Sequence, residues 1–212
     1  IFFNCSIQRN KMIGGDSIEY ELLEKCCKLI KNENPFTCEI GVRLGMGSEV
    51  ILQSLKNKNH WHIGIDPYGD INYEHFDKDS EIKHLDGKSP TYSNNMKLQL
   101  VQSLNHNNYS LFQMSDDDFM NRFYNGVPVY NKGKKTIYKQ YDLVFLDGPH
   151  KTIDVLKELI FFGERLAKDG FIILDDYESF KFDLCIKVGE LINVKPMHVG
   201  KNKIVMRKYN GS

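Results

Sequence analysis

Residues 141–177 read YDLVFLDGPHKTIDVLKELIFFGERLAKDGFIILDDY, and the rest of the chain is organised around this stretch. Two short apolar runs, 142–147 and 171–174, each end in acidic residues. The residues between them predict a helix, because apolar side chains recur there at helical spacing. These are Val155, Leu156, Leu159, Phe162 and Leu166. The stretch therefore predicts a βαβ unit with parallel strands and a right-handed crossover.

Acidic side chains follow both strands of this unit. Asp147 opens the sequence Asp-Gly-Pro-His, and Asp175 and Asp176 follow the second strand. Because the carboxyl ends of parallel strands lie side by side, we expect these three acids to converge on the crevice where open α/β sheets hold ligands. Oxygen ligands suit magnesium, calcium or manganese, and His150 is placed to act as a general base. The alternative for each cluster is a helix cap or turn, but their combination favours a metal or catalytic role.

The composition is that of one α/β domain, and we expect residues 1–212 to form it. A chain of 212 residues with 41% hydrophobic content can bury a full core. Its 28 basic and 28 acidic residues balance, so no global field favours nucleic acid or an anionic membrane. No stretch resembles a membrane span or a signal peptide, which predicts a cytoplasmic location. The five cysteines lack metal-ligand spacing and are expected to be reduced packing residues. The oligomeric state is left open, with a homo-oligomer among the alternatives.

Residues 1–35 predict an N-terminal arm and a helix. The Gly14-Gly15 pair interrupts the first sixteen residues and favours a loose arm. Apolar residues recur at helical spacing from Ser17, with Asp16 or Ser17 as the cap, and Asn34-Pro35 ends this helix.

A strand, a glycine loop and a helix follow. The predicted strand Phe36–Ile40 runs into the sequence EIGVRLGMGS, which contains Glu39, Gly41 and Gly45. Glycine permits positive φ and lets a ligand approach the backbone closely. The dinucleotide fingerprint is not met, because Val50 stands where its third glycine is required, and this disfavours a bound pyrophosphate. A plain tight turn is the alternative.

Polar residues also follow the next two predicted strands. Trp61–Ile65 ends at Asp66, where doubly wound folds carry an acid that accepts hydrogen bonds from ribose hydroxyls. The alternative is a turn-forming Asp-Pro pair. The strand 110–114 is followed by Ser115 and Asp116, where a polar side chain could meet an adenine amino group. Here the alternative is an N-cap cluster for a helix over 119–124.

Three other segments complete the chain. Residues 67–93 are longer than an ordinary connection and predict a lid with aromatic walls for an acceptor, the alternative being a disordered surface excursion. Residues 127–139 predict a β-hairpin insertion, whose lysines favour a solvated edge over contact with RNA. Two short runs flanking Gly200-Lys201-Asn202 predict a closing antiparallel hairpin.

Over about residues 17–208 this pattern resembles the class I S-adenosylmethionine-dependent methyltransferases. The closer likeness is to the metal-dependent small-molecule O-methyltransferases, of the catechol type and of the macrocin and mycinamicin sugar type. It rests on Asp147-Gly148-Pro149-His150 and on the run Gly170–Asp176, GFIILDD. The resemblance implies an α/β, Rossmann-like, seven-stranded and mostly parallel sheet. Its C-terminal hairpin strand would be antiparallel, and helices would cover both faces.

The resemblance also implies the site residues. Asp147, Asp175 and Asp176 would bind Mg²⁺ or another divalent cation, and His150 with Asp147 would be catalytic. The cofactor S-adenosylmethionine would lie along Glu39, Gly41 and Gly45 with its methionine portion, on Asp66 with its ribose, and near Ser115 and Asp116 with its adenine. Arg43 and Met46 depart from the small or aromatic residues that relatives often carry in the first loop.

The expected function is metal-assisted methyl transfer to a hydroxyl group of a small molecule, a sugar or a phenol. Three alternatives stay open. The first is an RNA methyltransferase, which the neutral net charge disfavours. The second is an oxygenase of the cephalosporin-hydroxylase type, although only one histidine lies at the right edge for an iron site. The third is a non-catalytic binding protein on the same fold.

Overall fold

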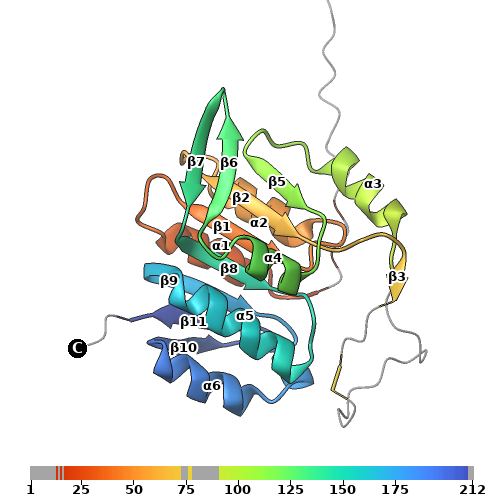
Figure 1. Cartoon of the computed structure of the whole chain (residues 1–212). Helices are drawn as coiled ribbons and strands as arrows, with labels where there is room; N and C mark the ends of the chain where they lie inside the picture. Colours follow the sequence, from red (N-terminus) through yellow and green to blue (C-terminus); the bar gives the residue numbers. More distant parts are fainter. Residues whose placement is uncertain (1–12, 14, 16, 73–75, 78–90, 210–212) are drawn as a thin grey trace, which may run out of the picture.

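A seven-stranded sheet forms the centre of the protein, in the order β10-β11-β9-β8-β1-β2-β5 (Figure 1). The computed structural model describes residues 13, 15, 17–72, 76–77 and 91–209. The strands of this sheet are β1 (Phe36–Ile40), β2 (Trp61–Ile65), β5 (Tyr109–Phe112), β8 (Tyr141–Leu146), β9 (Leu166–Leu174), β10 (Val194–Val199) and β11 (Ile204–Lys208). All neighbours are parallel except that β11 runs antiparallel to β9 and β10. This confirms the predicted Rossmann-like sheet with an antiparallel strand in its C-terminal hairpin.

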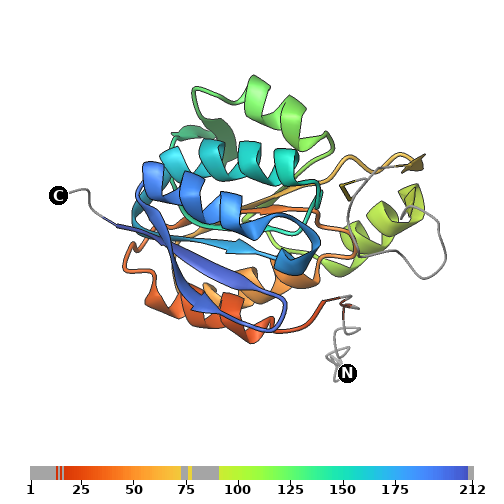
Figure 2. The same ribbon diagram turned by 90° about the horizontal axis from the view of Figure 1, so that it is seen from below.

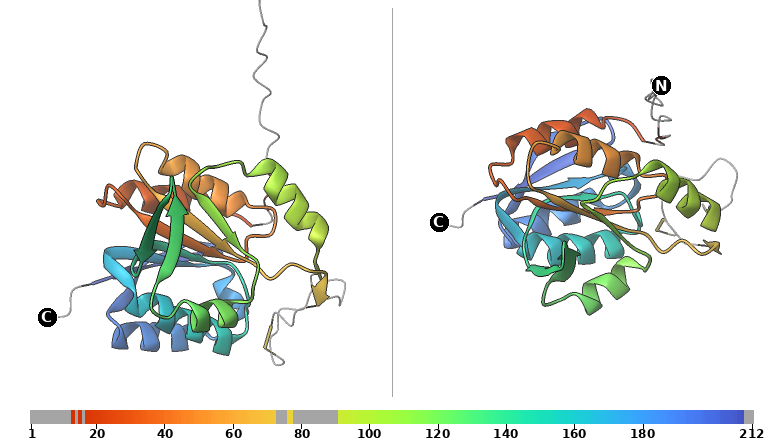
Figure 3. Two further views of the ribbon diagram at one scale, coloured as in Figure 1. Left: turned by 45° about the horizontal axis from the view of Figure 1, so that its top comes forward. Right: turned by 90° about the horizontal axis from the view of Figure 1, so that it is seen from above.

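Helices cover both faces of the sheet, as the sequence predicts. They are α1 (Glu21–Leu29), α2 (Met46–Ser54), α3 (Asn94–Ser103), α4 (Asp116–Arg122), α5 (Thr152–Glu164) and α6 (Phe182–Leu191), with a 3-10 turn η1 (Tyr177–Ser179). Helices α1 and α2 lie on one face and α4, α5 and α6 on the other (Figure 2, Figure 3). Because both faces are covered, every residue of β1, β2 and β8 is buried.

The predicted βαβ unit is present as β8, α5 and β9. Alternate residues of β8 enter different cores: Val144 and Leu146 pack on the α5 side, whereas Leu143 and Phe145 pack on the α1 and α2 side. Leu146 pairs with Leu174 at the carboxyl ends of the two parallel strands. The residues that follow each strand are therefore neighbours in space.

Two boundaries differ from the sequence-based expectation. The periodicity placed Leu166 on the helix, but it pairs with Tyr141 and opens β9. The first helix begins at Glu21 rather than at Ser17, because Glu19 has φ 59°, which is incompatible with a helical turn. Ser17 is thereby released from a capping role and hydrogen-bonds to Asp175 instead.

Two small antiparallel pairs lie outside the main sheet. Strands β6 (Val127–Asn131) and β7 (Lys134–Tyr138) form the predicted hairpin, and its turn residues Lys132 and Gly133 have positive φ. Strands β3 (Ile71–Asn72) and β4 (Thr91–Tyr92) pair at the two ends of the predicted lid. Most of that lid and most of the N-terminal arm lie outside the described residues, so both stay predictions.

Four buried cysteines, Cys26, Cys27, Cys38 and Cys185, are free thiols that pack in the cores, as expected. Within residues 13–209, as far as these are described, no helix has the length and apolar character needed to cross a bilayer.

Candidate functional site

The acidic strand ends lie together at the carboxyl edge of the sheet. The Asp147 N–H donates to Ile40 O at the end of β1, and the Asp175 N–H donates to Leu146 O at the end of β8, each at 2.9 Å. Asp176 then adopts a left-handed conformation with φ 44° and ψ 43°, which aspartate tolerates better than most residues. The structure therefore brings the three predicted acids to one edge.

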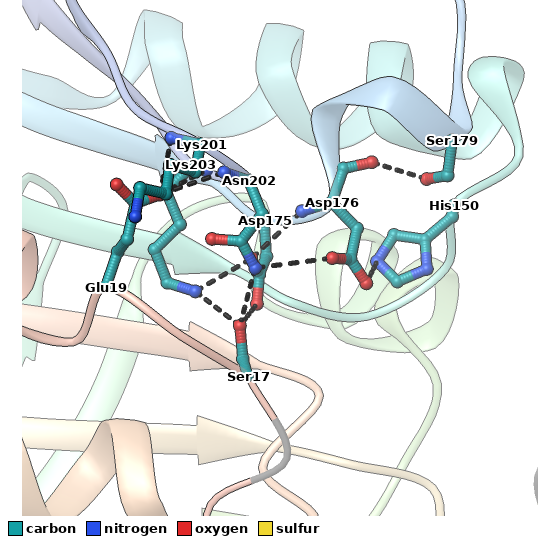
Figure 4. A network of polar contacts seen from close by, with 9 residues as sticks. All are labelled: Ser17, Glu19, His150, Asp175, Asp176, Ser179, Lys201, Asn202 and Lys203. Carbon is teal, nitrogen blue, oxygen red and sulfur yellow. Dashed lines mark hydrogen bonds and ion pairs between the residues drawn. The ribbon is translucent and has the colours of Figure 1, made fainter.

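Asp175 is held by partners from both ends of the chain (Figure 4). Its Oδ1 accepts hydrogen bonds from Lys203 Nζ at 2.8 Å and from the Asp176 N–H at 2.9 Å, and its Oδ2 accepts one from Ser17 Oγ at 2.7 Å. The side chains of Asp175 and Lys203 are both fully buried. This is a dry ion pair at the centre of the acidic cluster.

These contacts bear on whether the acids fit a divalent cation. A carboxylate offers about four lone-pair directions, and three of those on Asp175 are already occupied. Among the residues that the structure describes, no group of three His, Cys, Asp or Glu side chains is arranged to hold a metal ion. The arrangement therefore does not support the predicted magnesium ion on Asp147, Asp175 and Asp176.

Asp147 and Asp176, the two acids beside Asp175, have carboxyl groups whose pKa values are raised above those of ordinary carboxyls. The surrounding protein removes water from the Asp147 carboxyl and, together with nearby Asp175, raises its pKa well above the usual value. Partial burial and Asp175 likewise raise the pKa of Asp176. Like charges at one strand edge thus favour keeping protons on the cluster.

His150 lies over this edge, as predicted. Its Nε2 is 3.9 Å from Asp176 Oδ2, and the Asp176 side chain is half exposed (Figure 4). The Phe76 ring stacks on the imidazole with centroids 5.6 Å apart, and the backbones of the two residues form a bridge. The imidazole is therefore covered by an aromatic ring on one side and lies beside the Asp176 carboxylate.

The residue after Phe76 secures the helix behind His150. Asp77 accepts hydrogen bonds from Thr152 N at 3.3 Å and from Thr152 Oγ1 at 2.5 Å, so a carboxylate sits at the N-terminus of α5. This part of the predicted lid segment contacts the site, whereas residues 73–75 and 78–90 lie outside the described chain.

The loop after β1 requires glycine at two positions, because the backbone φ is positive there and because a side chain would collide with neighbouring atoms. Gly41 has φ 82°, and a Cβ on it would lie 2.0 Å from the backbone oxygen of Asp147. Gly45 has φ 90° and begins α2, and a Cβ on it would lie 2.3 Å from Leu100. Both glycines hold the loop against its neighbours, and Gly41 also faces the cavity described below.

Glu39, which stays a predicted neighbour of the methionine portion of the cofactor, is buried beneath α2. Its carboxylate accepts a hydrogen bond from Ser48 Oγ, and His62 Nε2 is 4.0 Å away. Burial raises the pKa of Glu39 to about 8. In this structure Glu39 supports the glycine loop from below.

Asp66 is fully buried at the end of β2. Its Oδ2 accepts a hydrogen bond from the Arg43 N–H at 2.9 Å, and its Oδ1 accepts one from the Tyr68 N–H at 3.1 Å. Burial raises its pKa to about 6 despite these hydrogen bonds. Asp66 therefore joins the β1 loop to the β2 loop.

A small cavity with a volume of about 20 Å³ lies among the ends of four strands. Its lining consists of Ile40, Gly41, Ile65, Pro67, Asp116, Gly148 and Pro149. Two predicted cofactor residues, Gly41 and Asp116, are among these lining residues. Asp66 lies in the chain between Ile65 and Pro67, which also line the cavity. Burial has the largest effect on the Asp116 carboxyl and raises its pKa, and the neighbouring Asp117 raises it further. Ser115 instead caps α4, because its Oγ accepts a hydrogen bond from the Asp118 N–H.

The residues that surround Asp175 were not predicted from the sequence. Lys203 was assigned only to the closing hairpin, and Ser17 only to a helix cap. Glu19 was also overlooked, although its carboxylate accepts hydrogen bonds from three backbone N–H groups of residues 201–203. No local spacing could reveal these contacts, because Ser17 and Asp175 lie 158 residues apart in the chain.

Comparison with known proteins assigns the family. A family model described as a methyltransferase domain matches residues 38–177, more than half of the chain. The chain therefore belongs to this methyltransferase family. It is also 22% identical over 167 residues to the uncharacterized protein R132 of Acanthamoeba polyphaga mimivirus. That match covers 78% of this chain and 62% of the viral protein, so the chain spans less than two thirds of that relative.

Solved structures with the same fold include two O-methyltransferases. An O-methyltransferase from Bacillus cereus in complex with SAH is matched with a TM-score of 0.59 and 10% identity, over 93% of this chain and 84% of that one. TomG from Streptomyces achromogenes, in complex with SAM, is matched with a TM-score of 0.55 and 10% identity, over 92% and 82%. At these identities the likeness establishes the fold.

Proposed function

We propose that this chain uses S-adenosylmethionine to methylate a hydroxyl group of a small molecule, a sugar or a phenol. The family match supports methyl transfer, and the similar bacterial O-methyltransferases were solved with SAM or SAH. The cavity beside Gly41 and Asp116 lies where a doubly wound sheet holds its nucleotide. We assign the adenosine part of the cofactor to the strand ends around this small cavity, and its ribose hydroxyls to Asp66.

The position of His150 is the observation that carries the proposal. The two residues before it, Gly148 and Pro149, line the cavity, and its Nε2 is 3.9 Å from Asp176 Oδ2. Methylation of a hydroxyl releases a proton, which requires a base next to the methyl donor. His150 meets this requirement, and the Asp176 carboxylate would stabilise the imidazolium that forms.

S-adenosylmethionine would supply a methyl group on a sulfonium and leave as S-adenosylhomocysteine. Transfer of this methyl group to the acceptor oxygen would release the hydroxyl proton. His150 takes the hydroxyl proton and passes it to solvent. We assign Asp147 to holding the acceptor by a hydrogen bond, because it directly precedes Gly148 of the cavity lining and its carboxyl is close enough to Asp175 for that residue to raise its pKa. No step in this proposal passes through magnesium, because Asp175 is already bonded to Lys203, Ser17 and the Asp176 N–H.

Two measurements test the proposal. The first is calorimetric titration with S-adenosylhomocysteine, where we expect saturable binding at micromolar concentration. The second is transfer of a labelled methyl group from S-adenosylmethionine to a panel of catechols, simple phenols, deoxysugar glycosides and RNA. We expect label on a phenol or sugar hydroxyl. Label on RNA alone would favour the RNA alternative, and a folded protein without cofactor binding would favour an oxygenase or a binding protein.

A further inference from the structure

We propose that Lys203 is a built-in counter-ion of the acidic strand ends, and that its ammonium group prevents a divalent cation from binding there. The proposal concerns the ionic state of the site and goes beyond the transfer reaction. It explains why a chain with the acidic residues of a metal site does not fit the metal.

The first observation is the environment of the ammonium group. Lys203 Nζ donates to Asp175 Oδ1 at 2.8 Å and to Ser17 Oγ at 2.5 Å, and the Lys203 side chain is fully buried. It also lies 5.2 Å from the centroid of the Tyr20 ring and 5.5 Å from that of Phe145, and both rings attract a cation. These surroundings suit a cation, and the ammonium group of Lys203 is the cation that occupies them.

The second observation is the clamp that holds Lys203 in place. Glu19 Oε2 accepts hydrogen bonds from the backbone N–H groups of Lys201, Asn202 and Lys203, at 2.7, 2.9 and 3.4 Å. The Asn202 side-chain amide donates to Ser17 Oγ at 3.0 Å. The hairpin turn is therefore fastened to the segment before α1 (Figure 4). This clamp fixes the backbone of Lys203 beside Asp175.

The third observation is the competition for Asp175. A divalent cation would find only one of the four lone-pair directions of Asp175 unoccupied, and it would lie close to a buried ammonium group. Repulsion between two cations is strong where water is excluded. The single positive charge of Lys203 already balances Asp175. Lys203 is thus a positioning residue, because it touches Asp175 and does not reach the cavity.

Manganese uptake tests this inference without cofactor or acceptor, so its outcome is independent of the proposed reaction. The paramagnetic signal of free Mn²⁺ is followed as wild type and four variants are titrated. These variants are Lys203→Met, Lys201→Met, Asp175→Asn and the double variant Lys203→Met with Asp175→Asn. Lys201→Met is the matched control, because this exposed lysine lies on the same turn and contributes its backbone N–H.

We expect wild type and Lys201→Met to take up no Mn²⁺ below about 1 mM, the weak end of protein sites for divalent cations. Lys203→Met should take up one Mn²⁺ and gain thermal stability from it, since its acids have lost their counter-ion. The double variant should take up none, and its stability should not respond to Mn²⁺.

Two results would overturn the inference. One is uptake of one Mn²⁺ at micromolar concentration by wild type that Asp175→Asn abolishes. The other is a folded Lys203→Met variant that takes up no Mn²⁺. If Lys203→Met does not fold, with or without Mn²⁺, the comparison of wild type with Asp175→Asn decides: no uptake by either supports the inference.

Discussion

Gly41 lies directly against the backbone oxygen of Asp147, so that a Cβ added to Gly41 would be 2.0 Å from that oxygen. The first glycine of the β1 loop and the first acid of the β8 end are thus in contact. The cavity and the acidic cluster share this boundary. A change on one side of the contact must affect the other.

Replacement of Gly41 by alanine should therefore disturb both fold and site. Gly41→Ala places a side chain at φ 82° and against fixed backbone, and we expect the free energy of unfolding to fall by at least about 1 to 3 kcal/mol. Urea unfolding measures this. Gly133→Ala is the matched control, because Gly133 has φ 76° but no atom within 4 Å of its added Cβ. Equal losses in the two variants would show that the contact with Asp147 is unimportant.

The role of His150 can be separated from its packing. We expect His150→Ala to lower the rate of methyl transfer by about 10²- to 10⁴-fold at neutral pH, the usual contribution of a general base. Binding of S-adenosylhomocysteine should change little, because His150 does not line the cavity. Higher pH should restore part of the rate if hydroxide replaces the imidazole. His106→Ala is the control, since His106 pairs with Glu49 away from the acidic edge; a similar loss there would contradict the assignment.

Asp66 should matter to both the loops and the cofactor. Asp66→Ala removes a carboxylate that accepts the N–H groups of Arg43 and Tyr68, and we expect cofactor affinity to fall by about 1.5 to 3 kcal/mol. Calorimetric titration of the folded variant with S-adenosylhomocysteine measures this loss of affinity. Asp142→Ala is the control, because Asp142 also accepts a backbone N–H, that of Phe36, at the other end of the sheet. It should destabilise the fold and leave the affinity unchanged. Unchanged affinity in Asp66→Ala would remove Asp66 from the cofactor site.

The sequence was informative where chemistry is local. The periodicity of the βαβ unit and the ordered succession of strand ends predicted the sheet, and the parallel pairing of β8 with β9 then had to bring Asp147 and Asp175 together. Gly41 could be recognised because a tight loop demands glycine. The sheet, the meeting of Asp147 and Asp175 and the need for Gly41 all follow from rules for adjacent residues and for parallel strands.

The ionic state of the site could not be predicted in the same way. Lys203 reaches Asp175 only because β11 runs antiparallel beside β9, and Ser17 reaches it only because the helix begins four residues later than the periodicity suggested. An acidic motif alone does not show whether a metal ion or a lysine balances it. The same limit applies to the surroundings of Glu39, because the resemblance that implies its cofactor role does not reveal its hydrogen bond from Ser48 on α2.

Buried His62 should make the protein sensitive to acid. Its Nδ1 is 2.9 Å from Thr37 Oγ1 and its Nε2 is 2.9 Å from Ser48 Oγ, and burial lowers its pKa to about 3. In the unfolded chain a histidine titrates near pH 6.5. Between these values the unfolded state binds more protons than the folded state. The stability that neutral His62 provides is therefore complete above about pH 6.5 and is lost as the pH falls towards 3.

We expect the free energy of unfolding to fall by up to about 1.4 kcal/mol for each pH unit below 6.5 on account of His62 alone. Glu39 acts in the opposite sense, because its raised pKa of about 8 makes stability fall as the pH rises from about 4.5. The comparison of variants removes this background. In urea unfolding between pH 7 and pH 5, His62→Asn should show a slope against pH that is smaller by about one proton. His198→Asn, at an exposed position on β10, should keep the wild-type slope. If His62→Asn also keeps it, the buried imidazole does not control the acid response.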